Sequence, residues 1–142
     1  LYSRFKVYSE RYNKQTNIEI STAIRMARNE IYPCIIKYVT NISQMINSVR
    51  EALKEEEYIQ FDKEHLVKVI NFKNKLKNCI TELNEGLRTA TMITDDYERA
   101  CFYNSNLVPL LNQMRVVVDS LELLVDKTVW PIPTYYDLLF RL

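Results

Sequence analysis

The chain of 142 residues contains a single glycine, Gly86. β-Hairpins, tight turns and phosphate-wrapping loops depend on glycine, because it adopts positive φ without steric cost. The composition therefore argues against a sheet protein and against a glycine-rich nucleotide loop, and it favours an all-α fold. With 47% hydrophobic residues, the chain has the size and composition of one ordinary domain with a buried core.

Histidine and cysteine are also scarce. A single histidine, His65, excludes a zinc site built on histidine pairs, and its place in the first turn of a predicted helix indicates a surface residue or one in the shell around the helix cap. Cys34, Cys79 and Cys101 are odd in number and fall at apolar positions of helical patterns. We expect buried free thiols in a reducing compartment, hence a cytoplasmic protein, and neither a disulfide nor a metal framework.

No strong charge or apolar run points to a nucleic acid or membrane partner. The formal net charge is +1, and no apolar run approaches the roughly 18 residues of a membrane span. The acidic clusters at 55–57 and 95–96 are interpreted as turn charges and helix caps, and the lysine-rich stretch 63–77 as a solvated face. No catalytic, cofactor-binding or metal-binding constellation is predicted. The chain begins at Leu1 in mid-helix pattern, so we expect it to be part of a longer protein.

Apolar residues recur at steps of three and four from about residue 2 to residue 53 and predict one long amphipathic helix. Pro33 interrupts this pattern; a kinked helix is favoured over two helices that meet at Tyr32. A straight helix of this length would be about 78 Å long at about 1.5 Å per residue. Its first half is therefore expected to pack on protein outside this segment.

Two further helices are predicted at about 62–93 and 95–127. Asp62 is the expected N-cap of the first, and Asp95 with Glu98 forms a capping pair for the second. Gly86, inside a helix, predicts close packing against a neighbour, and Pro109 predicts a bend. Short connections make neighbouring helices antiparallel. The predicted fold is an antiparallel three-helix bundle (up-down-up) with a long, Pro-kinked first helix.

The last fifteen residues, 128–142, read as a docked tail with a short terminal helix. Pro131 and Pro133 withhold two backbone donors, and Thr134 with Asp137 resembles a capping box before a short apolar turn. Tyrosines spaced along the first half-helix fit either an interface or the edge of a core. The candidate interface or docking residues are Tyr2, Tyr8, Tyr12, Trp130, Tyr135, Leu138, Leu139 and Phe140.

Two stretches resemble the C-terminal region of bacterial type III glutamine synthetases. The first is AIRMARNEIYPCIIKY, residues 23–38, with Ala-Arg-Asn followed by an apolar residue and a proline. The second is LELLVDKTVWPIPTYYDLLF, residues 121–140, which is similar to the family's closing pattern of Leu-Glu, an acidic residue, Trp-Pro-x-Pro, tyrosine and Leu-Leu-Phe. Residues 51–103 match in pattern only.

The resemblance implies that the parent protein condenses glutamate with ammonia in nitrogen metabolism, using ATP and Mg²⁺ or Mn²⁺. The family's catalytic residues lie upstream of Leu1, so this segment would contain no site and would serve as a structural or oligomerisation domain. Its partners would be the catalytic domain of the same chain and other copies in a homo-oligomer of stacked hexameric rings. The alternative is a stand-alone helical module that binds a partner protein through the tyrosines or the tail.

Overall fold

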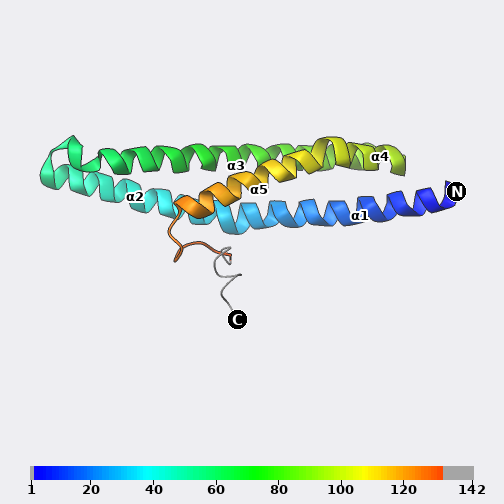
Figure 1. Cartoon of the computed structure of the whole chain (residues 1–142), viewed down its shortest axis with the longest axis horizontal. Coiled ribbons are helices and arrows are strands. Elements are labelled where there is room, and N and C mark those ends of the chain that lie inside the picture. The colour runs from blue at the N-terminus through cyan, green and yellow to red at the C-terminus, as the bar shows by residue number, and fades with distance from the viewer. Residues whose placement is uncertain (1, 133–142) are drawn as a thin grey trace.

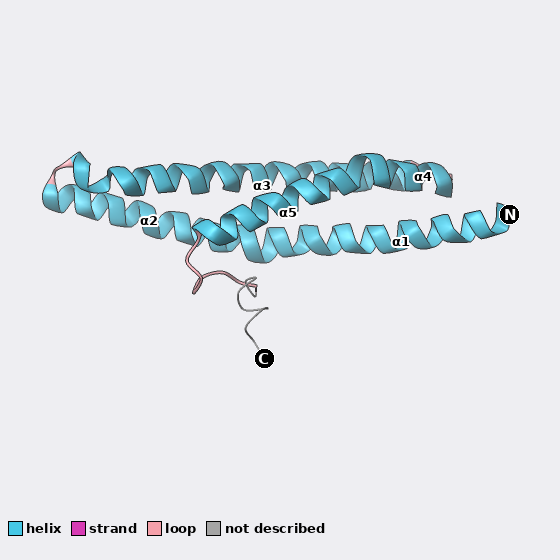
Figure 2. Cartoon of the chain, in the orientation of Figure 1, coloured by secondary structure: helices cyan, strands magenta, loops and turns pink. Residues whose placement is uncertain are grey.

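A computed structural model describes residues 2–132, and all regular structure in that part of the chain is helical, as predicted (Figure 2). The long helices are α1 (Tyr2–Met26), α2 (Tyr32–Leu53), α3 (Gln60–Met92) and α5 (Val108–Leu124). The short α4 (Asp96–Phe102) precedes α5. None of the described helices is long and apolar enough to cross a membrane.

Figure 1 shows how these helices are arranged. α1 and α2 form one long arm that runs from the N-terminus to a hairpin at the far end of the molecule, and α3 returns along it. α4 lies beside the N-terminal part of α1, and α5 then runs back toward the middle of the arm and packs chiefly on α3. Helix α3 begins at Gln60 with no side-chain cap, so the expected capping role of Asp62 is wrong. The turn Glu56–Ile59 enters α3 directly because Ile59 is fully buried beneath it.

Both internal prolines follow a π-helical turn. Ala27–Ile31 precedes Pro33, and Tyr103–Leu107 precedes Pro109. A proline ring clashes with the carbonyl four residues back, and that residue lies inside the π turn in each case. A π turn hydrogen-bonds five residues apart, as Tyr32 N–H does to the Ala27 carbonyl. Helical structure therefore continues through both prolines without a break.

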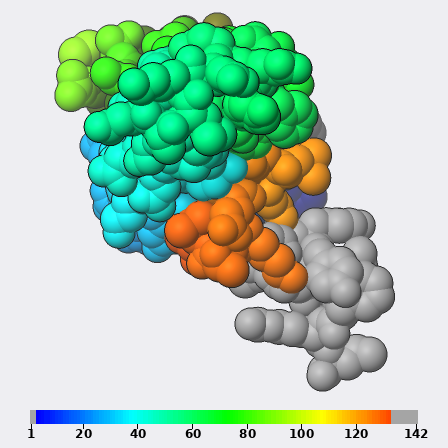
Figure 3. All heavy atoms as spheres, turned by 90° about the vertical axis from the view of Figure 1, so that its left-hand side faces the viewer, coloured from blue at the N-terminus to red at the C-terminus, as the bar shows by residue number. Residues whose placement is uncertain are grey.

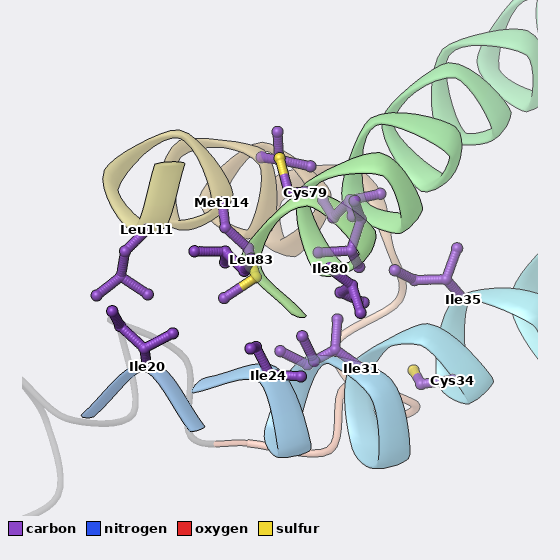
Figure 4. Packing of buried hydrophobic residues seen from close by; sticks show 14 of the residues in the cluster. Ile20, Ile24, Ile31, Cys34, Ile35, Cys79, Ile80, Leu83, Leu111 and Met114 are labelled. Carbon is purple, nitrogen blue, oxygen red and sulfur yellow. The ribbon is translucent and has the colours of Figure 1, made fainter. Parts of the chain in front are cut away.

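The core is formed by the facing sides of α1, α2, α3 and α5 (Figure 4). Leu83 on α3 is fully buried at its centre, opposite Ile24 and Ile31, with Met114 of α5 beside it. A Cβ atom at Gly86 would lie 2.0 Å from Leu107 Cδ2, which is closer than any real contact. The close packing expected at Gly86 is confirmed, because a methyl group there would require the Leu107 side chain of the second π turn to shift.

Candidate interface surfaces

The seam between α1 and α4 is polar. Ser9, Asn13 and Thr16 on α1 are buried, and Asn13 Nδ2 donates a hydrogen bond of 2.9 Å to the Asp96 carbonyl. The first half-helix was expected to pack on protein outside this segment. That expectation is wrong for its inner face, because α4 covers it. Periodicity of apolar residues missed the contact because small polar side chains make it.

The hydrogen bonds of this seam leave one buried acceptor without a described partner. Asn17 Nδ2 donates to the Tyr103 hydroxyl at 3.0 Å. The Asn13 amide is oriented by the Asp96 carbonyl, since only Nδ2 can donate there, and its Oδ1 is buried without a hydrogen bond. A buried, unpaired amide oxygen opposes folding, so this seam is held less well than its burial suggests.

The tyrosines of α1 divide between core edge and surface. Tyr12 is half-buried against the core, whereas Tyr8 is 72% exposed. Tyr2 begins α1, and its side chain lies outside the described residues. Phe5, 56% exposed, contacts Tyr97 of α4 with ring centroids 5.3 Å apart. Sequence patterns gave no signal for this pair, because α4 is too short to show an apolar repeat that includes Tyr97.

These rings line what we call the aromatic hollow, a shallow depression of about 240 Å³ between α1 and α4. Its rings come from Phe5, Tyr8, Tyr12 and Tyr97. Aromatic side chains that are partly exposed and partly held suit protein interfaces, because they cover a large area at low entropic cost. Two of the candidate interface residues, Tyr8 and Tyr12, thus come together at one surface.

Trp130 lies apart from the aromatic hollow and belongs to the core. Its side chain is 7% exposed, and Val129 and Ile132 on either side also pack on the core. Cys34 of α2 donates its thiol hydrogen to the Val129 carbonyl at 2.7 Å, which fixes the start of the tail against α2. Burial raises the pKa of the Cys34 thiol. Tyr135, Leu138, Leu139, Phe140 and the predicted terminal helix lie outside the described residues.

The single histidine ties three helices together. His65 Nε2 lies 2.8 Å from the Tyr38 hydroxyl, and that hydroxyl donates to the Leu124 carbonyl at 3.3 Å. Its ring is half-buried rather than fully exposed. Burial first, and the carboxylate of Asp126 second, raise the pKa of Tyr38. The contact keeps α2, α3 and the end of α5 in register.

All three cysteines are free thiols, as predicted, and Cys34 and Cys79 are buried. Cys101 is exposed, which corrects the prediction of a buried position. The π turn at Tyr103–Leu107 adds a residue to one helical turn and so shifts the phase of the pattern on its N-terminal side. Read back from Leu111 with a constant period, the pattern therefore placed Cys101 on the wrong face.

The acidic clusters have structural roles where the structure describes them. Asp95 caps α4 by accepting the Glu98 N–H at 3.0 Å, as predicted. Glu56 pairs with Lys63 and with Arg50, and these hydrogen bonds lower the pKa of its carboxyl. Within residues 2–132 no group of three or more histidine, cysteine or carboxylate side chains converges on one point. The described carboxylates of these clusters serve instead as a helix cap and as ion-pair partners.

The described part of the chain is therefore a helical bundle with an apolar core, a polar seam and partly exposed aromatic side chains. Residues 1–50 match the family model described as the glutamine synthetase C-terminal domain. Curated glutamine synthetases are similar along almost the whole chain. A Bacteroides fragilis protein is 29% identical over 140 residues, which is 96% of this chain and 19% of the relative.

The type-3 glutamine synthetase of Dictyostelium discoideum is 25% identical over 99% of this chain and 20% of its own length. A glutamine synthetase from Butyrivibrio fibrisolvens is 24% identical over 100% of this chain and 20% of its own length. These matches confirm the resemblance to the C-terminal region of type III glutamine synthetases. The chain spans about a fifth of the length of the curated relatives that it matches.

Proposed function

We propose that residues 1–142 are the C-terminal structural and oligomerisation domain of a glutamine synthetase. In this proposal the parent polypeptide joins glutamate and ammonia at the expense of ATP, with Mg²⁺ or Mn²⁺, at a site outside this segment. The similarity of the whole chain to about one fifth of each curated synthetase carries the proposal. The parent protein would be cytoplasmic and homo-oligomeric, without nucleic acid or membrane partners.

The aromatic hollow is the surface that we assign to the catalytic domain of the same chain. It lies at the N-terminal end of α1, where any preceding chain must enter. Phe5 and Tyr97 are each more than half exposed yet held against one another, so docking would bury them without large reordering. The remainder of the domain then projects from this point along α1 and α2.

The first experiment is to determine the mass and the activity of the native polypeptide that carries this segment. We expect a polypeptide about five times larger than 16.9 kDa, from the share of each relative that the chain covers, and γ-glutamyl transferase activity in the purified protein. A native mass near 16.9 kDa without activity would instead support the stand-alone helical interaction module.

The docking surface has its own test. Tyr97→Ala with Phe5→Ala should weaken packing between the segment and the catalytic domain, and limited proteolysis should then release the segment faster. Val116→Ala with Leu123→Ala is the matched control, because both side chains are exposed on α5, at 65% and 88%. Equal release rates in the two variants would show that the aromatic hollow is not the contact.

A further inference from the structure

The outer face of α1 carries a regular basic stripe, opposite the buried polar seam. Arg4, Val7, Arg11, Lys14, Ile18 and Arg25 fall on it, at steps of three, four or seven residues. All of these side chains are exposed, and the stripe includes four cations and no carboxylate. Both salt bridges described within residues 2–132 are at Glu56, so neither joins the stripe.

The connection between α2 and α3 forms an acidic tip, which we define as residues 51–64. It contains six carboxylates and two lysines, a net charge of −4. Three large apolar side chains project from it: Leu53, Tyr58 and Phe61 are 52%, 60% and 79% exposed. Figure 3 looks along the molecule from this end and shows the α2–α3 connection facing the viewer. Carboxylates around exposed apolar side chains favour binding to a partner surface that is basic and partly apolar.

The basic stripe is both positively charged and partly apolar, as a surface that binds the acidic tip would need to be. Val7 and Ile18 are 47% and 60% exposed between its cations, and a shallow hollow of about 360 Å³ lies along its first turns. Stripe and tip cannot meet within one chain, because they lie at opposite ends of the arm (Figure 1). Their charges are complementary, and each offers apolar side chains that the other could cover.

We propose that the acidic tip of one copy of this chain docks on the basic stripe of a second copy. If the two arms lie antiparallel, each tip meets the other copy's stripe, so the contact forms twice around a two-fold axis. Such an isologous pair is closed and does not grow into a filament. The proposal rests on the oligomerisation role given above and names its partner and surface. The hollow on the stripe shares Tyr8 with the aromatic hollow, whereas Phe5, Tyr12 and Tyr97 line the aromatic hollow alone.

A charge swap in the full-length polypeptide tests this contact. Variant one carries Arg4→Glu and Arg11→Glu in the stripe, and variant two carries Glu55→Lys and Glu57→Lys in the tip. Each variant alone should associate more weakly, on the order of a hundredfold in dissociation constant, because the substitutions take the net charge of the stripe from +4 to 0, or that of the tip from −4 to 0, and so remove the attraction. In an equimolar mixture, sedimentation should show tighter association than for either variant alone, since one of the two contacts of the mixed pair joins an unchanged tip to an unchanged stripe.

Matched controls reverse equally exposed charges away from both surfaces. Arg88→Glu with Arg115→Glu, and Glu82→Lys with Glu85→Lys, should leave the wild-type mass unchanged. Other interfaces could keep the subunits together when this contact is lost, so the contact is also tested by crosslinking. A photo-crosslinker placed at position 61, in a mixture of isotope-labelled and unlabelled copies, should react with residues 4–25 of a different copy. Crosslinks elsewhere, or a mixture that stays dissociated, would overturn the proposal. Synthetase activity, measured on the same samples, tests the proposed function separately.

Discussion

The inner face of α1 changes chemistry along its length, and the two halves illustrate different ways to hold a helix. From Ser9 to Thr16 the buried side chains are polar, and Asn13 among them donates a hydrogen bond to the Asp96 carbonyl of α4. From Ile20 to Ile31 they are apolar and pack on α3 and α5. Removal of apolar area from water stabilises folding by about 25 cal/mol per Å², whereas a net hydrogen bond contributes only about 1 kcal/mol. The apolar half should therefore dominate stability, and the polar half should be the part that opens first.

The largest expected effect belongs to the apolar region. Trp130→Ala should lower the free energy of unfolding by about 3–5 kcal/mol, because the ring is buried against the core and the mutation leaves a cavity. Urea unfolding followed by circular dichroism measures this change. Leu83→Ala, at the centre of the core, is the reference, with an expected loss of about 2–5 kcal/mol. A loss at Trp130 below about 1 kcal/mol would contradict its place in the core.

The contact between Gly86 and Leu107 gives a smaller effect with a sharper signature. Gly86→Ala gains about 1 kcal/mol of helix propensity but forces a methyl group into Leu107, and such overpacking costs about 1–3 kcal/mol. We expect a net loss of about 1 kcal/mol. In a Leu107→Ala background the same substitution should become stabilising, because the obstructing side chain is gone. A double-mutant cycle by urea unfolding measures the coupling, and additive effects would contradict the close approach.

Sequence reasoning found the apolar half of this comparison and missed the polar half. Apolar residues at helical spacing mark α2, α3 and α5, and Gly86 signalled a close approach, because both signals depend on local pattern. The contact of Asn13 with Asp96 joins residues 83 positions apart, and small polar side chains carry no periodic mark. Cys101 was placed on the wrong face because a π turn shifts the phase of the helix. Pro109 was the available signal for that turn.

The contribution of the polar seam to stability can be tested by replacing one of its buried polar side chains with an apolar one. Asn13→Leu removes the hydrogen bond to Asp96 and also the unpaired Oδ1, so the two changes oppose one another. We expect stability to change by less than about 1 kcal/mol. The reverse exchange, Leu83→Asn, should cost several times more, because it leaves an amide unsatisfied in an apolar core. Similar losses in the free energy of unfolding for Asn13→Leu and Leu83→Asn would contradict the proposed difference between the polar and apolar regions.

Native-state hydrogen exchange tests which region opens first. Amides of α4 and the first half of α1 should exchange through openings of lower free energy than those at the centre of α3, because fewer apolar contacts hold them. Asn13→Leu should change exchange in α1 only slightly, because its two effects on stability oppose one another, and should leave α3 unchanged. Equal protection of α1 and α3 in the unmodified chain would contradict the ranking of the two regions.

The smallest expected effect is the pH dependence at the exposed end of the α2–α3 hairpin. Hydrogen bonds from Lys63 and Arg50 hold the pKa of Glu56 below its usual value in the folded chain. The stabilisation from this pairing is therefore fully present above the usual carboxyl pKa and is lost as pH falls through the lowered value. Glu56→Gln should be slightly less stable than the unmodified chain near neutral pH, and the difference in stability should close as the solution is acidified to about pH 3.

Comparison of urea midpoints at both pH values measures this difference. Glu57→Gln is the control, because Glu57 has no ion pair among the described residues. Because the Glu56 side chain is 59% exposed, roughly 1 M salt should screen the pairing and remove most of the difference at neutral pH. A gap that persists at low pH and in high salt would mean that Glu56 acts through packing and not through its charge.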